Sequence, residues 1–205
     1  MKLLNFNKVL CLSPHPDDVE YGMLGSILKF IDTEFDILIF SQGGNFDDSS
    51  SSERYTECEL IWNEIDNLTG HFLPRNRLGN ICEDELVNEV EVFTSKLKYD
   101  CIFTPPSRDS HFEHRLISQI SYPLVRRKKC GIVQYKTPST LENWSSNFFV
   151  QINLNKKAKF LKYFESQTNK SFFNKPSLKS FHTDYQCTKR SLGFVELYNI
   201  IKIYN

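Results

Sequence analysis

The sequence predicts an α/β protein, a three-layer sandwich around a mainly parallel sheet with a β-rich C-terminal extension. Short apolar runs alternate with segments whose apolar residues recur at helical spacing. Several of these runs end in turns marked by serine, proline or glycine. Of the 205 residues, 40% are hydrophobic, which is enough to cover both faces of a sheet. We expect a single domain over residues 1–205, because domains usually contain about 100–200 residues.

The N-terminal third of the chain predicts a strand–helix–strand unit followed by a second helix. Residues 8–12 (KVLCL) and 35–40 (FDILIF) are apolar runs typical of buried parallel strands. Between them, apolar side chains recur at helical spacing over residues 23–31. The same spacing predicts a second helix over 58–68, and a brief third strand follows at 71–73.

The alternation continues into the middle of the chain. A third helix is expected over residues 86–97 and the next strand over 99–104, where two prolines stop it. A fourth helix begins near Glu113, and Pro123 is expected to kink or end it.

The C-terminal part predicts strands near 131–135 and 147–153, then helical stretches near 156–167 and 180–192. A β-rich tail occupies residues 194–203. The complete order is typical of a Rossmann-like sheet with helices on both faces.

Composition excludes several classes of protein. Lysine and arginine number 25, as do aspartate and glutamate, so the chain lacks the basic field of a typical nucleic-acid or anionic-membrane binder. No stretch approaches the roughly 18 apolar residues that cross a bilayer, and the N-terminus lacks a signal-peptide pattern. The six cysteines are scattered without a CxxC pair. We therefore expect a cytoplasmic protein with reduced thiols, no nucleic-acid partner and no transmembrane segment.

Two loops at predicted strand ends contain most of the residues that could carry chemistry. Residues 13–20 (SPHPDDVE) follow the first strand, and residues 107–114 (SRDSHFEH) follow the strand that ends at Thr104. Loops at the carboxyl ends of parallel strands lie at one edge of the sheet. We therefore expect the two loops to converge.

The residue types in these loops fit a catalytic zinc site. Such sites usually have three protein ligands of imidazole or carboxylate type and leave one position for water. His15 and Asp18 lie three residues apart in a turn stiffened by Pro16, and His114 supplies the third ligand from the second loop. Because successive side chains diverge, Asp17 is left free as a general base.

Two further residues of the second loop are candidates for supporting roles. His111 lies one helical turn before His114, where it could stabilise the oxyanion or protonate the leaving amine. Asp109 could orient one of the histidines from outside the metal site.

Each candidate also has a purely structural explanation. Asp17 or Asp18 could cap the first helix, and Asp109 or Ser110 could cap the fourth. A histidine pair at this spacing is often a solvated helix face. However, three of the five histidines lie in the two loops, each beside acidic residues, so the combination favours a metal site.

At these residues the chain resembles the LmbE/PIG-L family of metal-dependent N-acetylglucosaminyl deacetylases. The marks of that family are an (Ala/Pro)-His-Pro-Asp-Asp motif after the first strand, here residues 14–18, and a distant His-x-x-His, here residues 111–114. The resemblance extends to residues 22–25 (GMLG), 54–57 (RYTE) and 166–167 (SQ), and so covers most of the chain.

The resemblance implies Zn²⁺, or another divalent metal such as Fe²⁺, bound by three residues: His15, Asp18 and His114. It also implies Asp17 as general base, His111 as the residue that assists at the oxyanion, and Arg54 as a contact to the substrate. The implied substrate is a small N-acetylated amino sugar or its conjugate. Arg54 has an alternative role as a solvated first-turn residue that pairs with acidic neighbours.

The chain departs from the family pattern at three places that line the expected substrate cleft. Residues 43–45 (GGN) replace a Gly-Glu pair, 112–113 (FE) replace Pro-Asp in the second motif, and 78–80 (LGN) replace an Asp-Gly turn. None of these changes removes a ligand. They leave the identity of the sugar conjugate open, as the sequence also does for the native metal, a homo-oligomeric state and the role of the loop over 47–52.

Two other functions compete with deacetylation. Hydrolysis of another amide or ester, including a phosphoester, is disfavoured because only Arg54, Arg108 and Arg115 lie near the motifs, whereas phosphoryl chemistry usually recruits more cations or two metals. A non-catalytic module that binds a sugar conjugate is disfavoured by the intact ligands and by Asp17, which such a module would be free to lose.

Overall fold

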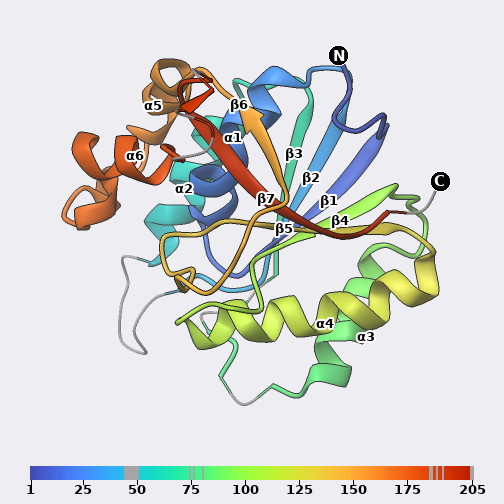
Figure 1. Cartoon of the computed structure of the whole chain (residues 1–205). Coiled ribbons are helices and arrows are strands. Elements are labelled where there is room, and N and C mark those ends of the chain that lie inside the picture. The colour runs from blue at the N-terminus through green and yellow to red at the C-terminus, as the bar shows by residue number, and fades with distance from the viewer. Residues whose placement is uncertain are drawn as a thin grey trace.

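A mixed sheet of seven strands forms the middle layer of the protein, shown by a computed structural model (Figure 1). The structure describes residues 1–43, 51–73, 75, 77–79, 81–184, 187, 189–190 and 192–203. The strands are β1 (Lys8–Ser13), β2 (Glu34–Ile39), β3 (Leu68–Phe72), β4 (Cys101–Thr104), β5 (Gly131–Tyr135), β6 (Phe148–Gln151) and β7 (Val195–Lys202). The helices are α1 (Asp18–Lys29), α2 (Ser51–Trp62), α3 (Glu83–Phe93), α4 (Phe112–Lys128), α5 (Leu154–Leu161) and α6 (Lys175–Phe181), with two 3₁₀ turns, η1 (Glu165–Gln167) and η2 (Ser171–Phe173).

The strand order is β3-β2-β1-β4-β5-β7-β6. Strands β1 to β5 pair in parallel. Strand β7 inserts between β5 and β6 and is antiparallel to both. The predicted fold class, a mainly parallel α/β sheet, is confirmed. The predicted β-rich tail forms β7, which joins the edge strand β6 to the parallel strands.

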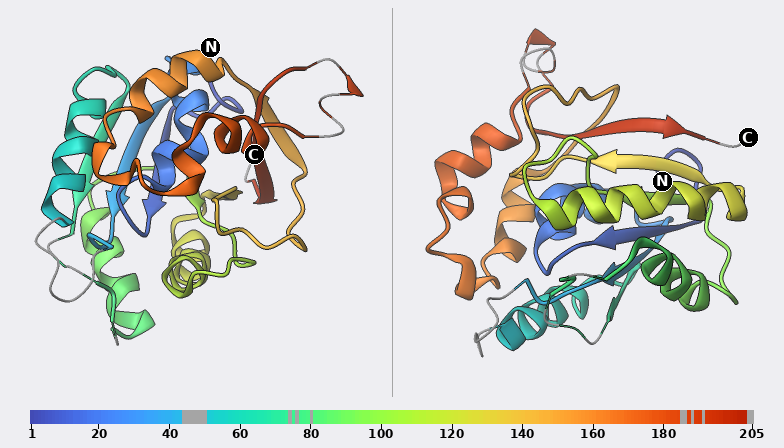
Figure 2. Two further views of the ribbon diagram at one scale, coloured as in Figure 1. Left: turned by 90° about the vertical axis from the view of Figure 1, so that its left-hand side faces the viewer. Right: turned by 90° about the horizontal axis from the view of Figure 1, so that it is seen from below.

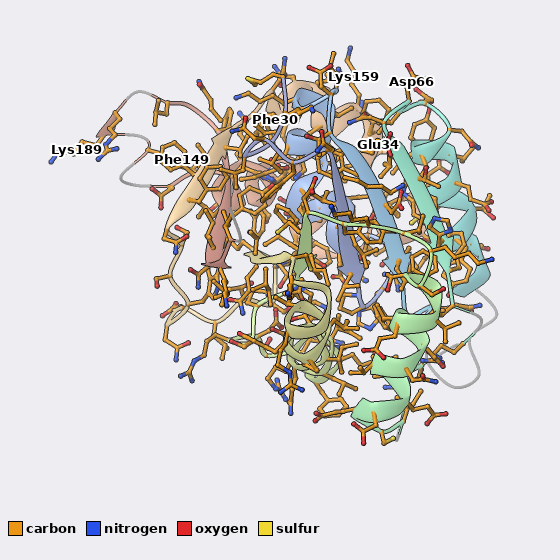
Figure 3. The ribbon with its side chains drawn as sticks, turned by 90° about the vertical axis from the view of Figure 1, so that its right-hand side faces the viewer. Phe30, Glu34, Asp66, Phe149, Lys159 and Lys189 are labelled. Atoms are coloured by element: carbon orange, nitrogen blue, oxygen red, sulfur yellow. The ribbon has the colours of Figure 1, made fainter. Side chains whose placement is uncertain are left out.

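Helices cover both faces of the sheet (Figure 2). Strand β1 shows why its sequence is continuously apolar, since Val9 and Cys11 pack into the core beneath α1, α2 and α5, while Leu10 and Leu12 pack into the core beneath α3 and α4. Side chains fill the spaces between the sheet and both helical layers (Figure 3). No helix in the described part of the chain is long and apolar enough to cross a membrane.

Several predicted boundaries are wrong. The second helix spans Ser51–Trp62 rather than 58–68, because the chain turns after Trp62 and Leu68 already belongs to β3. Pro123 was expected to kink or end the fourth helix, and it does not end it, because α4 continues through Pro123 to Lys128. Leu124 and Val125, which follow the proline, are buried in the core, and this packing compensates for the missing backbone donor.

Three other helices differ from the prediction in extent. Helix α3 ends at Phe93 instead of continuing to residue 97. The stretch expected over 156–167 forms α5 and then the separate turn η1. Helix α6 ends at Phe181, and the predicted stretch over 180–192 lies partly outside the described residues.

Candidate metal centre and its surroundings

The two loops identified from the sequence lie at the carboxyl ends of two adjacent strands. Strand β1 pairs in parallel with β4. The chain leaves β1 into the turn before α1, which begins at Asp18, and leaves β4 into the loop before α4, which begins at Phe112. The structure therefore brings the two loops together, as the parallel arrangement requires.

Histidine and carboxylate side chains from both loops converge at one point. One ring nitrogen each of His15, His111 and His114 lies within 4.8 Å of the others. Asp18 lies between two of these rings, with its Oδ2 atom 3.2 Å from His15 Nδ1 and 3.2 Å from His114 Nε2. His15, Asp18 and His114 are buried, whereas His111 is exposed.

The charges at this point suit a cation. Burial alone would raise the pKa of Asp18, but the neighbouring His114 and His15 hold it well below its usual value. Burial alone would lower the pKa of His114, but Asp18 and Asp109 on its two sides raise it to about 10. The same field that holds a proton on His114 would attract a divalent cation. Two imidazoles and one carboxylate are also a donor set that zinc accepts, so the residues fit the metal.

Asp109 contacts the histidines from outside the cluster. Its Oδ2 atom lies 3.1 Å from His114 Nδ1 and accepts a hydrogen bond of 2.5 Å from Thr137 Oγ1. Its Oδ1 atom accepts a 2.8 Å hydrogen bond from the backbone N–H of His111, the N-cap residue of α4. Asp109 thus contacts the His114 ring and the His111 backbone, which is the arrangement expected of a residue that orients metal ligands from outside the metal site.

Asp17 has an unusual backbone conformation and a cationic partner. Its φ of 94° lies in the left-handed region, which aspartate tolerates better than most residues. It occupies the N-cap position of α1 but makes no side-chain capping hydrogen bond. Instead its Oδ2 atom accepts a 2.9 Å hydrogen bond from Arg54 Nη2. Burial raises the pKa of Asp17, and Arg54 opposes this shift.

Arg54 is a buried residue of α2, only 7% exposed, rather than a solvated surface residue. Besides Asp17, its guanidinium donates to the carbonyl oxygens of Pro16 and Gln42, the latter at 2.9 Å. Arg54 therefore fixes the turn that presents Asp17, and it also lines the cavity above the histidines.

Sequence reasoning missed Glu113. One oxygen of this buried carboxylate contacts His15 Nε2 and lies 3.4 Å from Ser41 Oγ. The other accepts a 3.0 Å hydrogen bond from the Leu78 backbone N–H. The available signal is an acidic residue between the two histidines of the second motif, at the position where the family pattern has an aspartate.

A cavity of about 170 Å³ lies over the cluster. The residues that line it are His15, Asp17, Asp18, Arg54, His111 and His114, together with Tyr21, Gly43, Pro138, Ser139, Lys170 and Phe172. Lys170 and Phe172 were also missed, because they follow the two histidine motifs by more than 50 residues and lie outside the short 166–167 pair that carries the resemblance in this segment. The loop over 47–52, whose role the sequence left open, lies largely outside the described residues.

The fold and this donor set define a class: a mainly parallel α/β protein with a histidine and carboxylate centre at the carboxyl edge of its sheet. The profile of the PIG-L family, described as GlcNAc-PI de-N-acetylase, matches residues 10–125, more than half of the chain. The chain therefore belongs to the PIG-L (LmbE-like) family.

Solved structures support the fold. The N,N'-diacetylchitobiose deacetylase of Pyrococcus horikoshii has a TM-score of 0.78 at 21% identity, over 97% of this chain and 85% of its own. A teicoplanin deacetylase has a TM-score of 0.72 at 11% identity, over 93% and 96%. The 4-carboxy-2-hydroxymuconate hydratase of Pseudomonas putida has a TM-score of 0.76 at 11% identity, over 100% and 98%. None of the curated proteins matches the chain in sequence.

Proposed function

We propose that this protein is a metal-dependent N-deacetylase that removes the acetyl group from an N-acetylated amino sugar or its conjugate. The observation that carries the proposal is the convergence of His15, Asp18 and His114 beside a separately held Asp17. Family membership supports the activity, and the names of two structural relatives are those of deacetylases. The fold alone does not decide the activity, because a hydratase shares it.

His15, Asp18 and His114 are the proposed metal ligands, with Zn²⁺ as the proposed ion and Fe²⁺ as the alternative. His111 is close enough to be a further ligand, but its exposure at the cavity suits contact with the substrate better. The chemistry supplied by a bound zinc ion is acidification of a water molecule and polarisation of an amide carbonyl.

Asp17 is the proposed general base. Its carboxylate lines the cavity and is fixed by Arg54, so it can accept a proton from water without moving. Burial raises its pKa, which makes the carboxylate a stronger proton acceptor, and the proton it takes from water can then pass to the departing amine.

His111 is the proposed donor to the acyl oxygen. Its pKa is lowered by partial burial and by the charges of His15 and His114, so the neutral ring predominates near pH 7 and can donate one N–H. The Asp109 contact to its backbone fixes where this ring enters the cavity.

The experiment is measurement of acetate release from N-acetylglucosamine, N,N'-diacetylchitobiose, and nucleotide-linked and lipid-linked N-acetyl sugars, with and without added zinc. Asp17→Asn should retain the metal, measured by mass spectrometry of the purified protein, and lose about 10²–10⁴-fold in turnover. The matched control is Asp66→Asn, which changes an exposed aspartate and should leave turnover unchanged. Full turnover of the Asp17 variant would remove it from the mechanism, and a metal-loaded protein that releases no acetate would favour another hydrolysis or a binding module.

Two further proposals concern the domain organisation and the cellular location of the protein. We propose a single domain over residues 1–205, because Leu154, Leu161 and Leu178 of the C-terminal helices share one core with β1 and α1. All six cysteines are free thiols, which suits a reducing compartment, and we propose a cytoplasmic location.

A further inference from the structure

Residues 165–173 form one wall of the cavity over the histidine cluster. This segment, here called the cavity wall, contains η1 and η2 and lies between α5 and α6. Lys170 and Phe172 of the cavity wall line the cavity. The Lys170 ammonium lies 3.8 Å from Asp17 Oδ2 and 5.5 Å from the centre of the Phe172 ring.

A single carboxylate of α2 binds the beginning of the cavity wall. Glu57 Oε1 accepts a 2.7 Å hydrogen bond from the Ser166 backbone N–H, and Glu57 Oε2 accepts one of 2.7 Å from Ser166 Oγ. Gln167 Nε2 in turn donates a 2.8 Å hydrogen bond to Ser166 Oγ. Glu57 is only 8% exposed, so these charge-assisted hydrogen bonds form in a setting where they are stronger than in water.

The position of Glu57 on α2 connects the cavity wall to the proposed base. Arg54 precedes it by three residues, and so lies on the same face of the helix. Arg54 binds Asp17 and Glu57 binds Ser166. One helical turn of α2 therefore sets the distance between Asp17 and the cavity wall.

The side chains that the cavity wall presents have the properties needed to bind a sugar. Phe172 is half-buried, with its ring against Tyr21, and it contributes an apolar side chain to the cavity lining. The Lys170 side chain is 44% exposed, so its ammonium can donate hydrogen bonds to hydroxyl or anionic groups of a conjugate.

We infer that Glu57 is a positioning residue, which fixes Ser166 and thereby holds Lys170 and Phe172 against the substrate beside Asp17. The inference rests on the proposed deacetylase function for its substrate, but the attachment of the cavity wall can be measured without any activity. Glu57 itself does not touch the reacting atoms.

The first test measures backbone amide exchange in Glu57→Gln and Ser166→Ala, with Glu53→Gln as the matched control. Residue 53 is an exposed glutamate of the same helix. We expect exchange in peptides covering 165–173 to rise by about tenfold in Glu57→Gln and by less in Ser166→Ala, which keeps the backbone hydrogen bond. Unchanged exchange in Glu57→Gln, or an equal rise in the control, would overturn the inference.

The second test uses acetate release from the best substrate in the panel above. Glu57→Gln should raise KM by about tenfold with kcat within about twofold, because the proposed base and ligands remain in place. In a Lys170→Met background the same substitution should raise KM by much less, because the group it positions is already lost. Additive effects of the two substitutions would refute the link.

A destabilised control separates positioning from loss of stability. Ile61→Val shortens a fully buried side chain of α2 and should lower the melting temperature without raising KM. If no substrate in the panel is deacetylated, the proposed function fails, while the exchange experiment still decides whether Glu57 holds the cavity wall.

Discussion

Acidification should destabilise the protein through His182, a histidine that is fully buried without a carboxylate partner. Its Nδ1 atom donates a 2.8 Å hydrogen bond to the Leu178 carbonyl oxygen, and its Nε2 atom accepts one of 2.9 Å from Lys157 Nζ. Both ring nitrogens are used by the neutral form. Burial, and then the charge of Lys157, lower the pKa of His182 to about 2.

The magnitude follows from the difference in pKa between the folded and unfolded states. An unfolded histidine titrates near pH 6.5, whereas the folded one stays neutral down to about pH 2. Below pH 6.5 the unfolded state therefore binds one more proton, and stability falls by about 1.4 kcal/mol per pH unit. Between pH 6.5 and 4.5 this single residue should cost about 2–3 kcal/mol of unfolding free energy.

The assay is urea denaturation of the wild type and of His182→Gln at half-unit steps from pH 7.5 to 4.5. Other groups titrate in this range, so the quantity to compare is the difference between the two proteins. As the pH falls, the free energy of unfolding of the wild type should decrease more steeply than that of His182→Gln, so the difference between the two proteins should shrink. Thr183→Val, which changes the next residue and removes no titrating group, should shift stability equally at every pH. Parallel curves for the wild type and His182→Gln would refute the reasoning.

Three further predictions concern the candidate centre. Arg54→Lys keeps the charge but loses the planar guanidinium that binds both Asp17 and the turn carbonyls. Acetate release should therefore fall about tenfold or more. Wild-type kinetics in this variant would show that the guanidinium geometry is not needed. Asp109→Asn should weaken zinc affinity about 10–100-fold through His114, measured by competition with a chelating dye, and an unchanged affinity would contradict that role. Chelation should abolish acetate release reversibly while the far-ultraviolet circular dichroism is retained; activity in the metal-free protein would exclude the proposed mechanism.

Local patterns in the sequence were enough to predict the parallel strands and the edge of the sheet at which the candidate metal centre lies. Strand β1 is apolar from Val9 to Leu12 because both of its faces are covered there. The two motif loops must meet because β1 and β4 are adjacent parallel strands. These features depend on residues that are close in sequence or follow a general rule of topology.

The features that the sequence did not reveal depend on contacts between distant residues. Ser166 meets Glu57 across 109 positions of the chain. The sequence singles out residues 54–57 and 166–167 separately, but nothing in either segment indicates that the two residues are in contact. The same holds for β7, which inserts between β5 and β6, since a β-rich tail predicts a strand but not its neighbours. Pro123 was misjudged for a related reason, because tertiary packing of Leu124 and Val125 outweighs a local preference.

Asp17 and Asp18 show how two identical neighbours can take different roles. The left-handed backbone at Asp17 turns the first carboxylate towards Arg54, whereas the second, at the start of α1, enters the space between His15 and His114. Their environments move their pKa values in opposite directions, upward for Asp17 and well downward for Asp18. A metal ligand must remain deprotonated, and a general base works best when its pKa lies closer to neutrality. These differences support the proposal that Asp18 is the metal ligand and Asp17 the general base, and exchanging the two proposed roles would require a different backbone at the turn.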